Sequence, residues 1–296
     1  MPHTMSKRTA HTHMIRVMTA LLLYLGLWAQ PATSANTVGS DVTIKTAIST
    51  EVSTDVSTGV STDVSAATKI DQTQVLPTPF RAVYEADYKG LPIRATAIRE
   101  LQQSAANQFI LSSTATSFFA SVSEVSNLTL TVKNHLIPIE YQYHRKGIGK
   151  NRHTALRFDW PAQRVIDEIQ STPWAMTIPT GTLDKLSYQL QMRYELLTAY
   201  QRGQPWPTLA YQVVDGGELK TYRFEVLGEE NVDTPIGRFS ALKIARVRTD
   251  SDRTTIFWLA PAYEFLLVRF LQEEQSGGFE LLLKEAKFRG EVIAGT

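Results

Sequence analysis

The chain has 296 residues, 30 Lys and Arg against 29 Asp and Glu, and no cysteine. The lack of cysteine excludes disulfides, thiolate nucleophiles and thiolate metal sites. A balanced charge lacks the basic excess that nucleic-acid binding requires, so we predict no nucleic-acid partner.

Residues 1–35 have the pattern of a cleavable secretory signal peptide. Three basic residues precede an apolar run over 17–28, and small residues after a proline fit a cleavage site that ends at Ala35. The run is shorter than the ~20 apolar residues that span a bilayer. We therefore predict export to the periplasm, with no permanent membrane span after signal cleavage. An uncleaved anchor is the alternative.

Residues 36–76 are predicted to be a disordered linker rich in Ser, Thr and Val. A four-residue repeat, S-T-x-V, recurs four times over 49–64, and the whole segment lacks aromatic residues. Such a composition cannot bury enough apolar surface to offset the chain entropy of folding. A flexible tether of this length spans ~35 Å root-mean-square. The segment is interpreted as a spacer or as a substrate for modification; a repeat without function is the alternative.

Residues 77–292 are predicted to form one antiparallel β domain, large enough to fold by apolar burial without disulfides. From Phe80 to Tyr88 polar and apolar residues alternate, which is typical of a half-buried strand. A turn is predicted at 89–90 and a hairpin at 215–217, which reads Asp-Gly-Gly. The short turns favour antiparallel pairing, because parallel pairing needs long crossovers. Further strands are predicted over 93–101, 107–114, 118–133, 138–146, 153–160, 208–215, 219–227, 238–249, 254–260, 263–272 and 279–289.

One segment, 183–201, breaks this alternation and is predicted to be a helix. Its leucines, together with a tyrosine, recur at helical spacing and give a broad apolar face. Thr182 is predicted as the N-cap and Asp184 as an acidic first-turn residue, while Gly203 and Pro205 end the helix. Such a face must be buried. We therefore predict a mostly β (α+β) fold, in which a curled antiparallel sheet of about ten strands wraps around one main helix.

Several short motifs resemble those of the domain of unknown function 3108 family, across nearly the whole of 80–290. The resemblance implies an exported, β-rich protein of Gram-negative bacteria without an assigned activity. The expected fold is similar to periplasmic lipoprotein-carrier half-barrels, whose curved sheet leaves an apolar cavity; this analogy does not transfer function. The motifs are FRAVY at 80–84, FDW at 158–160, PW at 173–174, IPTGTLDKLSYQL at 178–190, TPIG at 234–237 and WLA at 258–260.

Four residues of these motifs, Asp184, Ser187, Gln189 and Gly237, are interpreted as structural. Asp184 and Gln189 are expected to cap or bridge backbone groups, with ligand contact as the alternative. A Lys/Ser dyad of Lys185 and Ser187 is rejected, because residues two apart on a helix point in different directions.

Catalytic constellations are not apparent in the predicted β domain. Its histidines, His135, His144 and His153, are spaced nine apart, so adjacent hairpin strands are able to bring two of them together. No carboxylate lies near them at ligand spacing, and we predict surface histidines, no metal and no cofactor. The sequence also lacks the Gly-x-Ser-x-Gly motif of hydrolases. We therefore predict that the protein is not an enzyme.

Aromatic and apolar residues in and around the predicted helix suggest ligand binding instead. The residues predicted to line an apolar pocket are Trp174, Tyr188, Leu190, Tyr194 and Trp258. Ordinary core packing is the alternative for each. The leading hypothesis is a non-enzymatic periplasmic envelope protein that binds an apolar or lipid-like ligand in the sheet concavity. The second is an envelope scaffold or assembly factor that binds protein partners, and the third is an envelope hydrolase with a site assembled from distant residues.

Overall fold

The computed structural model describes most of the predicted β domain. The predicted signal peptide and nearly all of the predicted linker lie outside the described residues, as do the predicted turn at Gly90 and the segment 148–150. Within the described part, no helix has the length and apolar character that crossing a membrane requires. The described residues are 76–89, 94–118, 120–147, 151–167, 169, 173–249, 251–275 and 277–296.

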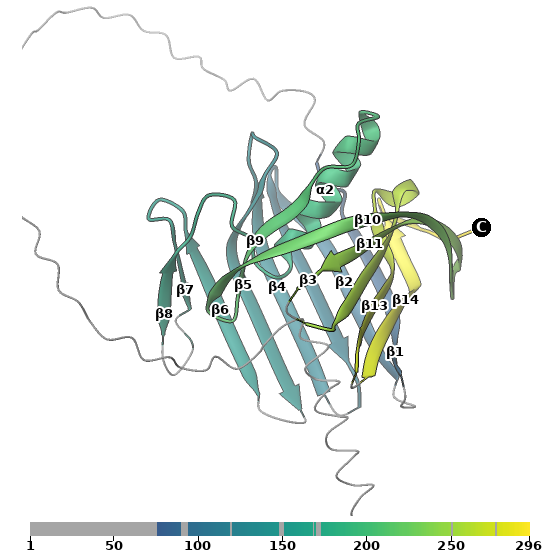
Figure 1. The fold of residues 1–296 in the computed structure, drawn as a ribbon, viewed down its shortest axis with the longest axis horizontal. Helices are drawn as coiled ribbons and strands as arrows, with labels where there is room; N and C mark the ends of the chain where they lie inside the picture. Colours follow the sequence, from purple (N-terminus) through teal and green to yellow (C-terminus); the bar gives the residue numbers. More distant parts are fainter. Residues whose placement is uncertain are drawn as a thin grey trace, which may run out of the picture.

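Within the described part of the chain, fifteen strands form a single antiparallel sheet. Figure 1 shows its arrangement. Most neighbours in the sheet are also neighbours in the chain, as in a meander. The strands are β1 (Phe80–Lys89), β2 (Arg94–Ala105), β3 (Gln108–Thr116), β4 (Ala120–Leu130), β5 (Leu136–Gly147), β6 (Arg152–Asp159), β7 (Arg164–Asp167), β8 (Trp174–Thr177), β9 (Leu209–Asp215), β10 (Glu218–Thr234), β11 (Gly237–Val247), β12 (Thr254–Ala260), β13 (Leu266–Glu274), β14 (Gly277–Phe288) and β15 (Glu291–Val292).

The predicted count of about ten strands is wrong. The sequence interpretation missed β7, β8 and β15, which have four, four and two residues. Such strands are too short to display an alternating pattern, so their pairing with neighbours, and not their composition, makes them strands. The predicted hairpin at 215–217 is confirmed: Asp215 pairs with Glu218 across two glycines that both have positive φ.

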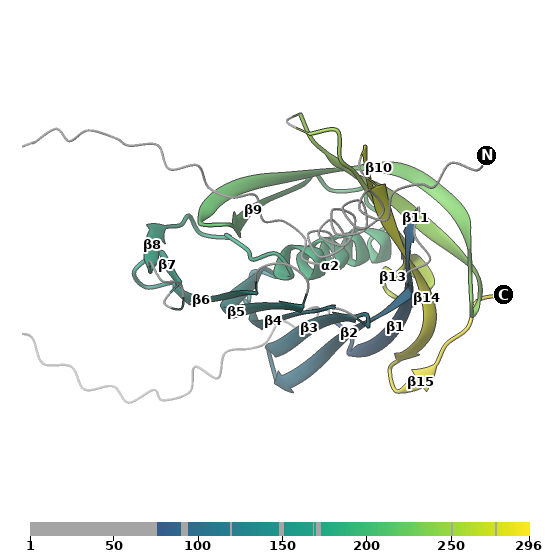
Figure 2. The same cartoon turned by 90° about the horizontal axis from the view of Figure 1, so that it is seen from below.

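The sheet curls around one helix, α2 (Ser187–Gln201), as the view in Figure 2 shows. Its middle is the pair β1 and β14, the first and last long strands, and its two ends, β8 and β9, do not pair. The sheet is therefore not closed into a barrel. Register shifts interrupt the pairing of several strands, including β1 at Val83/Tyr84 and β10 at Val226/Gly228. Such bulges increase the local twist and bend of a sheet.

The helix begins four residues later than predicted. Leu183 forms an isolated bridge with Val213 of β9, which holds the preceding segment as extended chain. Thr182 is not the N-cap, because its hydroxyl donates to the Pro179 carbonyl oxygen within a turn. Asp184 lies before the helix and not, as predicted, in its first turn, and its carboxylate accepts the backbone N–H groups of Leu186 and Ser187.

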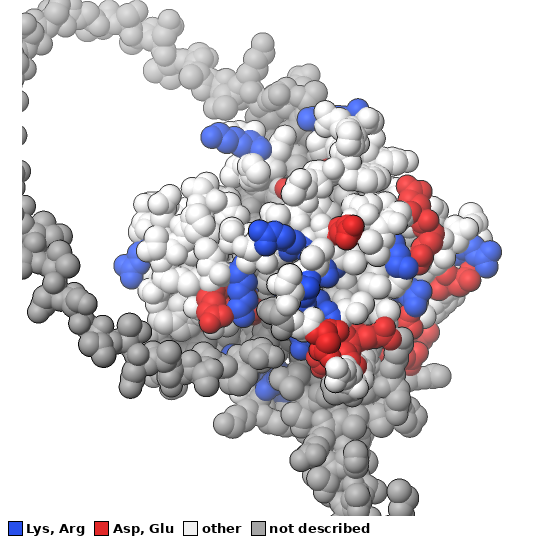
Figure 3. Space-filling view, viewed as in Figure 1, with Lys and Arg blue, Asp and Glu red and all other residues white. Residues whose placement is uncertain are grey.

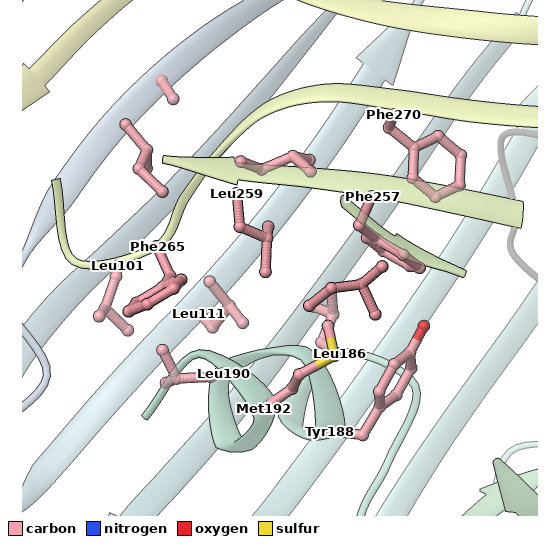
Figure 4. Packing of buried hydrophobic residues seen from close by; sticks show 14 of the residues in the cluster. Leu101, Leu111, Leu186, Tyr188, Leu190, Met192, Phe257, Leu259, Phe265 and Phe270 are labelled. Atoms are coloured by element: carbon pink, nitrogen blue, oxygen red, sulfur yellow. The ribbon is translucent and has the colours of Figure 1, made fainter. Parts of the chain in front are cut away.

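Side chains from the helix and both halves of the sheet meet in one core (Figure 4). Residues of β4 alternate between buried and half-buried along the whole strand, so one face of the sheet points at the helix. Met192 of α2 lines one small cavity together with Leu259 and Phe265, and Figure 4 labels all three. The helix is buried on nearly all sides, and its buried residues include Gln189, Gln191 and Arg193 besides the predicted apolar face. Polar groups inside the concavity therefore need partners there.

Candidate ligand-binding site

The start of α2 is fixed by a buried polar network. Asp184 Oδ1 accepts the backbone N–H groups of Leu186 and Ser187 at 2.7 and 2.8 Å. Asp184 Oδ2 accepts the hydroxyl of Ser126 from β4 at 2.6 Å, and the Asp184 backbone N–H donates to Ser187 Oγ at 2.7 Å. These bonds supply acceptors for N–H groups that every helix start leaves unpaired, and they join the helix to the sheet.

Charged groups next to Asp184 extend this network into the sheet. Glu124 of β4 is 3% exposed, and it accepts the hydroxyl of Tyr141 from β5. Lys185 Nζ lies 3.9 Å from Glu124 Oε1 and 4.6 Å from the centre of the Tyr143 ring. We call the group of residues 124, 126, 141, 184, 185 and 187 the helix-start network.

Burial dominates the electrostatics of these carboxyl groups. It raises the pKa of Glu124, and the nearby Lys185 charge and Tyr141 hydroxyl oppose it only in part. Burial likewise raises the pKa of Asp184 against the hydrogen bonds from Ser126 and the backbone. A carboxyl group held this way favours proton uptake. In this network both carboxyl groups serve as acceptors for neighbouring protein groups.

Two cavities lie between α2 and the sheet, on either side of Arg99. The first, which we call the apolar cavity, has a volume of about 40 Å³. The second, which we call the arginine cavity, has about 30 Å³. Arg99, Gln189 and Leu267 line both, so these three side chains form the partition between them. Each holds only a few atoms, since one water needs about 10–15 Å³.

The apolar cavity is bounded by small and aromatic side chains from both halves of the sheet. They include Ala97 and Ala115 on one side and Phe270, Phe279 and Leu281 on the other, and the buried Glu124 also lines the cavity. These strands, β2 and β3 against β13 and β14, flank the central β1. The alanines are responsible for the remaining volume, because larger side chains there would fill it.

Arg193 lies in the wall of the arginine cavity. Its side chain is 9% exposed, its Nε–H donates to the Glu264 carbonyl oxygen at 2.8 Å, and its guanidinium lies 4.7 Å from the Phe80 ring centre. Arg193 Nη1 and Arg99 Nε have no hydrogen-bond partner within the described part of the chain. Burial lowers the pKa of Arg193 to about 10, and the Arg99 charge acts in the same direction.

The five residues predicted as ligand-binding do not come together. Tyr188 packs edge-on against Tyr222, with ring centres 5.3 Å apart, and Leu190 and Tyr194 are buried in the core. Trp258 is 2% exposed within β12, and its indole N–H donates to Glu230. The remaining residue, Trp174, lines a separate cavity of about 30 Å³ beside Tyr141 and Lys185.

The residues predicted as structural lie where the backbone needs them. Asp184 and Ser187 form the helix start, and Gln189 Nε2 donates to the Lys185 carbonyl oxygen at 3.1 Å. Gly237 opens β11 with φ +114°, and a Cβ there would lie 2.8 Å from the Gly295 backbone. A close approach of two chains and a positive φ both require glycine.

Sequence reasoning missed Arg99 and Glu124, although the signal was present. Ala95, Ala97 and Leu101 lie at alternating positions of the predicted strand over 93–101 and are buried, and Arg99 falls at the inward position between Ala97 and Leu101. In the same way, Glu124 lies among the inward residues of β4. A charged residue at an inward position of an alternating strand indicates a partner or a site.

Two of the three histidines of the β domain lie side by side in the described part of the chain. His144 and His153 stack across β5 and β6, with ring centres 3.8 Å apart. Among the described residues, no group of three or more metal-ligating side chains is placed to hold an ion. On the face shown in Figure 3, Lys and Arg side chains are interspersed with Asp and Glu, and no single-sign field covers the described part of it.

A model of one protein family, described as "protein of unknown function (DUF3108)", matches residues 83–284. The chain belongs to the DUF3108 family. This match confirms the resemblance that the short motifs indicated. No curated protein matches this DUF3108 chain in sequence.

Solved structures with similar shapes have little sequence in common with this DUF3108 protein. A β-barrel-like DUF1849 protein from Brucella abortus covers 73% of the chain over 99% of its own length, with 10% identity and a TM-score of 0.49. A candidate lipoprotein from Parabacteroides distasonis covers 71% of the chain and 96% of its own, with 11% identity and a TM-score of 0.28. A candidate exported protein with a YmcC-like fold from Bacteroides fragilis covers 72% and 97%, with 11% identity and a TM-score of 0.28.

Proposed function

We propose that this protein is a non-enzymatic binding protein of the bacterial envelope, which takes an apolar, lipid-like chain between α2 and the sheet. The observation that carries the proposal is the pair of cavities on either side of Arg99. Their walls are mainly apolar, with a small number of polar groups, as in small-molecule sites. Location in the envelope rests on the signal pattern of residues 1–35.

Binding requires the partition between the two cavities to move. Gln189 and Arg99 have long, unbranched side chains, and Leu267 is the third residue shared by both walls. Rotation of the two polar side chains joins the cavities into one channel along α2. The two volumes together hold only a few water-sized groups, so a longer chain also requires α2 and the sheet to separate. An acyl chain in this channel gains about 0.8 kcal/mol for each buried methylene group.

Native mass spectrometry of protein recovered from the periplasm, followed by lipid extraction, tests the proposal. We expect a co-purifying amphiphile, and after its removal the protein should bind dodecanol, a neutral twelve-carbon probe. Ala115→Leu fills the apolar cavity and should weaken dodecanol binding at least ten-fold. Thr116→Leu, at the exposed neighbouring position of the same strand, is the matched control. Absence of dodecanol binding, or equal binding by both variants, would overturn the proposal.

N-terminal sequencing of the same material tests the location. Cleavage after Ala35 is the expected result. A protein that retains its leader in the membrane fraction would contradict export of a freely diffusing form.

A second candidate function is partner binding at a groove of about 470 Å³ beside the edge of β11. Only Leu242–Ala245 of β11 pair with β12, while Arg238 is bonded to the backbone of Thr296. Between them Ser240 lines the groove together with Tyr263. An open strand edge of this kind accepts an extended peptide. Photo-crosslinking in intact cells from position 240 should then yield a discrete protein adduct. A crosslinker at Thr221, exposed on β10, is the control.

A further inference from the structure

Two positively charged side chains face the arginine cavity from opposite walls. Arg99 comes from β2 of the sheet and Arg193 from the middle of α2. Two N–H donors, Arg193 Nη1 and Arg99 Nε, lack a hydrogen-bond partner among the described residues. A buried charged donor without an acceptor is costly, and a like charge nearby increases that cost.

Among the described residues that line this cavity there is no carboxylate. Two buried carboxylates lie beyond its wall: the charge of Glu264 acts on Arg193, and that of Glu124 interacts with Arg99. Glu264 Oε1 accepts hydrogen bonds from Thr78 and Arg289, and its Oε2 is buried without a hydrogen-bond partner among the described residues. The Tyr84 hydroxyl, also in the wall, donates to the Leu267 carbonyl oxygen. The two guanidinium groups therefore retain donor capacity that an anion is able to use.

The cavity has room for the acceptor atoms of a small anion. About 30 Å³ accommodates roughly two or three heavy atoms, at 10–15 Å³ for each water-sized group. A carboxylate has three heavy atoms, and it presents two acceptor oxygens in one plane, which matches the geometry of guanidinium donors.

We propose that the arginine cavity binds a carboxylate, with Arg193 Nη1–H and Arg99 Nε–H as its donors. The carboxylate is the polar end of the lipid-like ligand, and in this form the inference rests on the proposed function. The shared wall of Arg99, Gln189 and Leu267 leads from the carboxylate directly to the apolar cavity. A fatty acid, with one carboxylate and one chain, has this chemistry. A small free carboxylate has the same head group without the chain.

The test compares three probes on delipidated full-length mature protein by calorimetry: dodecanoate, dodecanol and acetate. We expect dodecanoate to bind at least ten-fold more tightly than dodecanol. Arg193→Met and Arg99→Gln should each abolish this preference, measured as the ratio of dodecanoate affinity to dodecanol affinity in the same variant. Arg193→Lys keeps the positive charge but loses the forked pair of guanidinium donors. We expect this variant to retain only part of the wild-type preference for dodecanoate. Arg223→Met, at an exposed position of β10, is the matched control.

The outcomes separate the two proposals. Equal affinity for dodecanoate and dodecanol would overturn the carboxylate site and leave the proposed function standing. Saturable acetate binding that Arg193→Met removes, without binding of either twelve-carbon probe, would support the carboxylate site and overturn the lipid-like ligand. Binding of none of the three probes would overturn both. If Arg193→Met does not fold, Arg99→Gln on the opposite wall gives the same discrimination.

Discussion

The helix-start network and the arginine cavity are two polar regions on the same buried helix, and they are built differently. In the first, Asp184 has hydrogen-bond partners on both carboxylate oxygens, and Ser126 ties it to the sheet. In the second, Arg193 and Arg99 keep N–H groups without partners among the described residues. The first region uses polarity to fix the position of the helix. The second region keeps N–H donors without a protein partner, and we propose that these donors bind a ligand.

This difference has an energetic meaning. A buried polar group whose partners are all present contributes modestly to stability, but removing one partner leaves the others unsatisfied. A buried charge that lacks partners costs stability, so replacing it by an apolar group of similar size is close to neutral or stabilising. Substitutions in the two regions should therefore have opposite consequences for stability and for binding.

The largest expected effect is that of Asp184→Ala. This change removes the acceptor for the N–H groups of Leu186 and Ser187 and for the hydroxyl of Ser126. We expect a loss of about 3–5 kcal/mol in the free energy of unfolding, measured by urea denaturation. A loss below about 1 kcal/mol would show that the network does not position the helix.

Tyr141→Phe should have the next largest effect. It removes the hydroxyl that donates to the buried Glu124 carboxylate, and hydrogen bonds to charged groups contribute about 1.5–3 kcal/mol. Tyr143→Phe is the control, because it preserves the ring against which Lys185 packs. Equal urea midpoints for the two variants would contradict a specific role for the Tyr141 hydroxyl.

Asp184→Asn should reveal the raised pKa of Asp184 through the pH dependence of stability. A carboxyl group whose pKa is higher in the folded state than its ordinary value of 3.8 stabilises the fold most when protonated. That contribution is lost as the pH rises through the folded-state pKa. We therefore expect the free energy of unfolding of the wild type, measured between pH 4 and 8, to exceed that of Asp184→Asn by the largest amount at pH 4. A difference that grows toward pH 8 would give the pKa shift the opposite sign.

The smallest effect on stability is expected for Arg193→Met. Methionine keeps the apolar stem and removes a buried charge, at the cost of one hydrogen bond to the Glu264 carbonyl oxygen. These contributions oppose each other, so the free energy of unfolding should change by less than about 1 kcal/mol. A loss similar to that of Asp184→Ala would place Arg193 among the residues that fix the fold and remove the contrast between the two regions.

Local patterns were enough to predict much of the sheet. The strand over 254–260 and the hairpin at 215–217 were predicted where the structure has them, because alternation and Asp-Gly-Gly turns act within a few residues. The helix end at Gln201 also agrees with its glycine and proline signals. The helix start does not, because Leu183 pairs with Val213, and this bridge overrides the apolar periodicity.

Such local patterns could not predict the candidate site. Arg99, Arg193 and Leu267 come from β2, α2 and β13, and only the curl of the sheet brings them to one cavity. The five predicted ligand-binding residues were chosen by residue type, and four of the five lie in the packed core: Tyr188, Leu190, Tyr194 and Trp258. Inward charges on an alternating strand, such as Arg99, were a more informative signal than aromatic residues were.

The pairing of β1 with β14 at the middle of the sheet has a consequence for folding kinetics. Phe80 is the partner of Phe288, so β1 and β14 pair only after almost the entire domain has been synthesised. Until then β1 presents an unpaired edge, which is prone to intermolecular association. Contacts between residues so far apart in the chain slow folding. A holding chaperone that covers β1 during synthesis should therefore increase the yield of folded protein, more than one that acts on the completed chain.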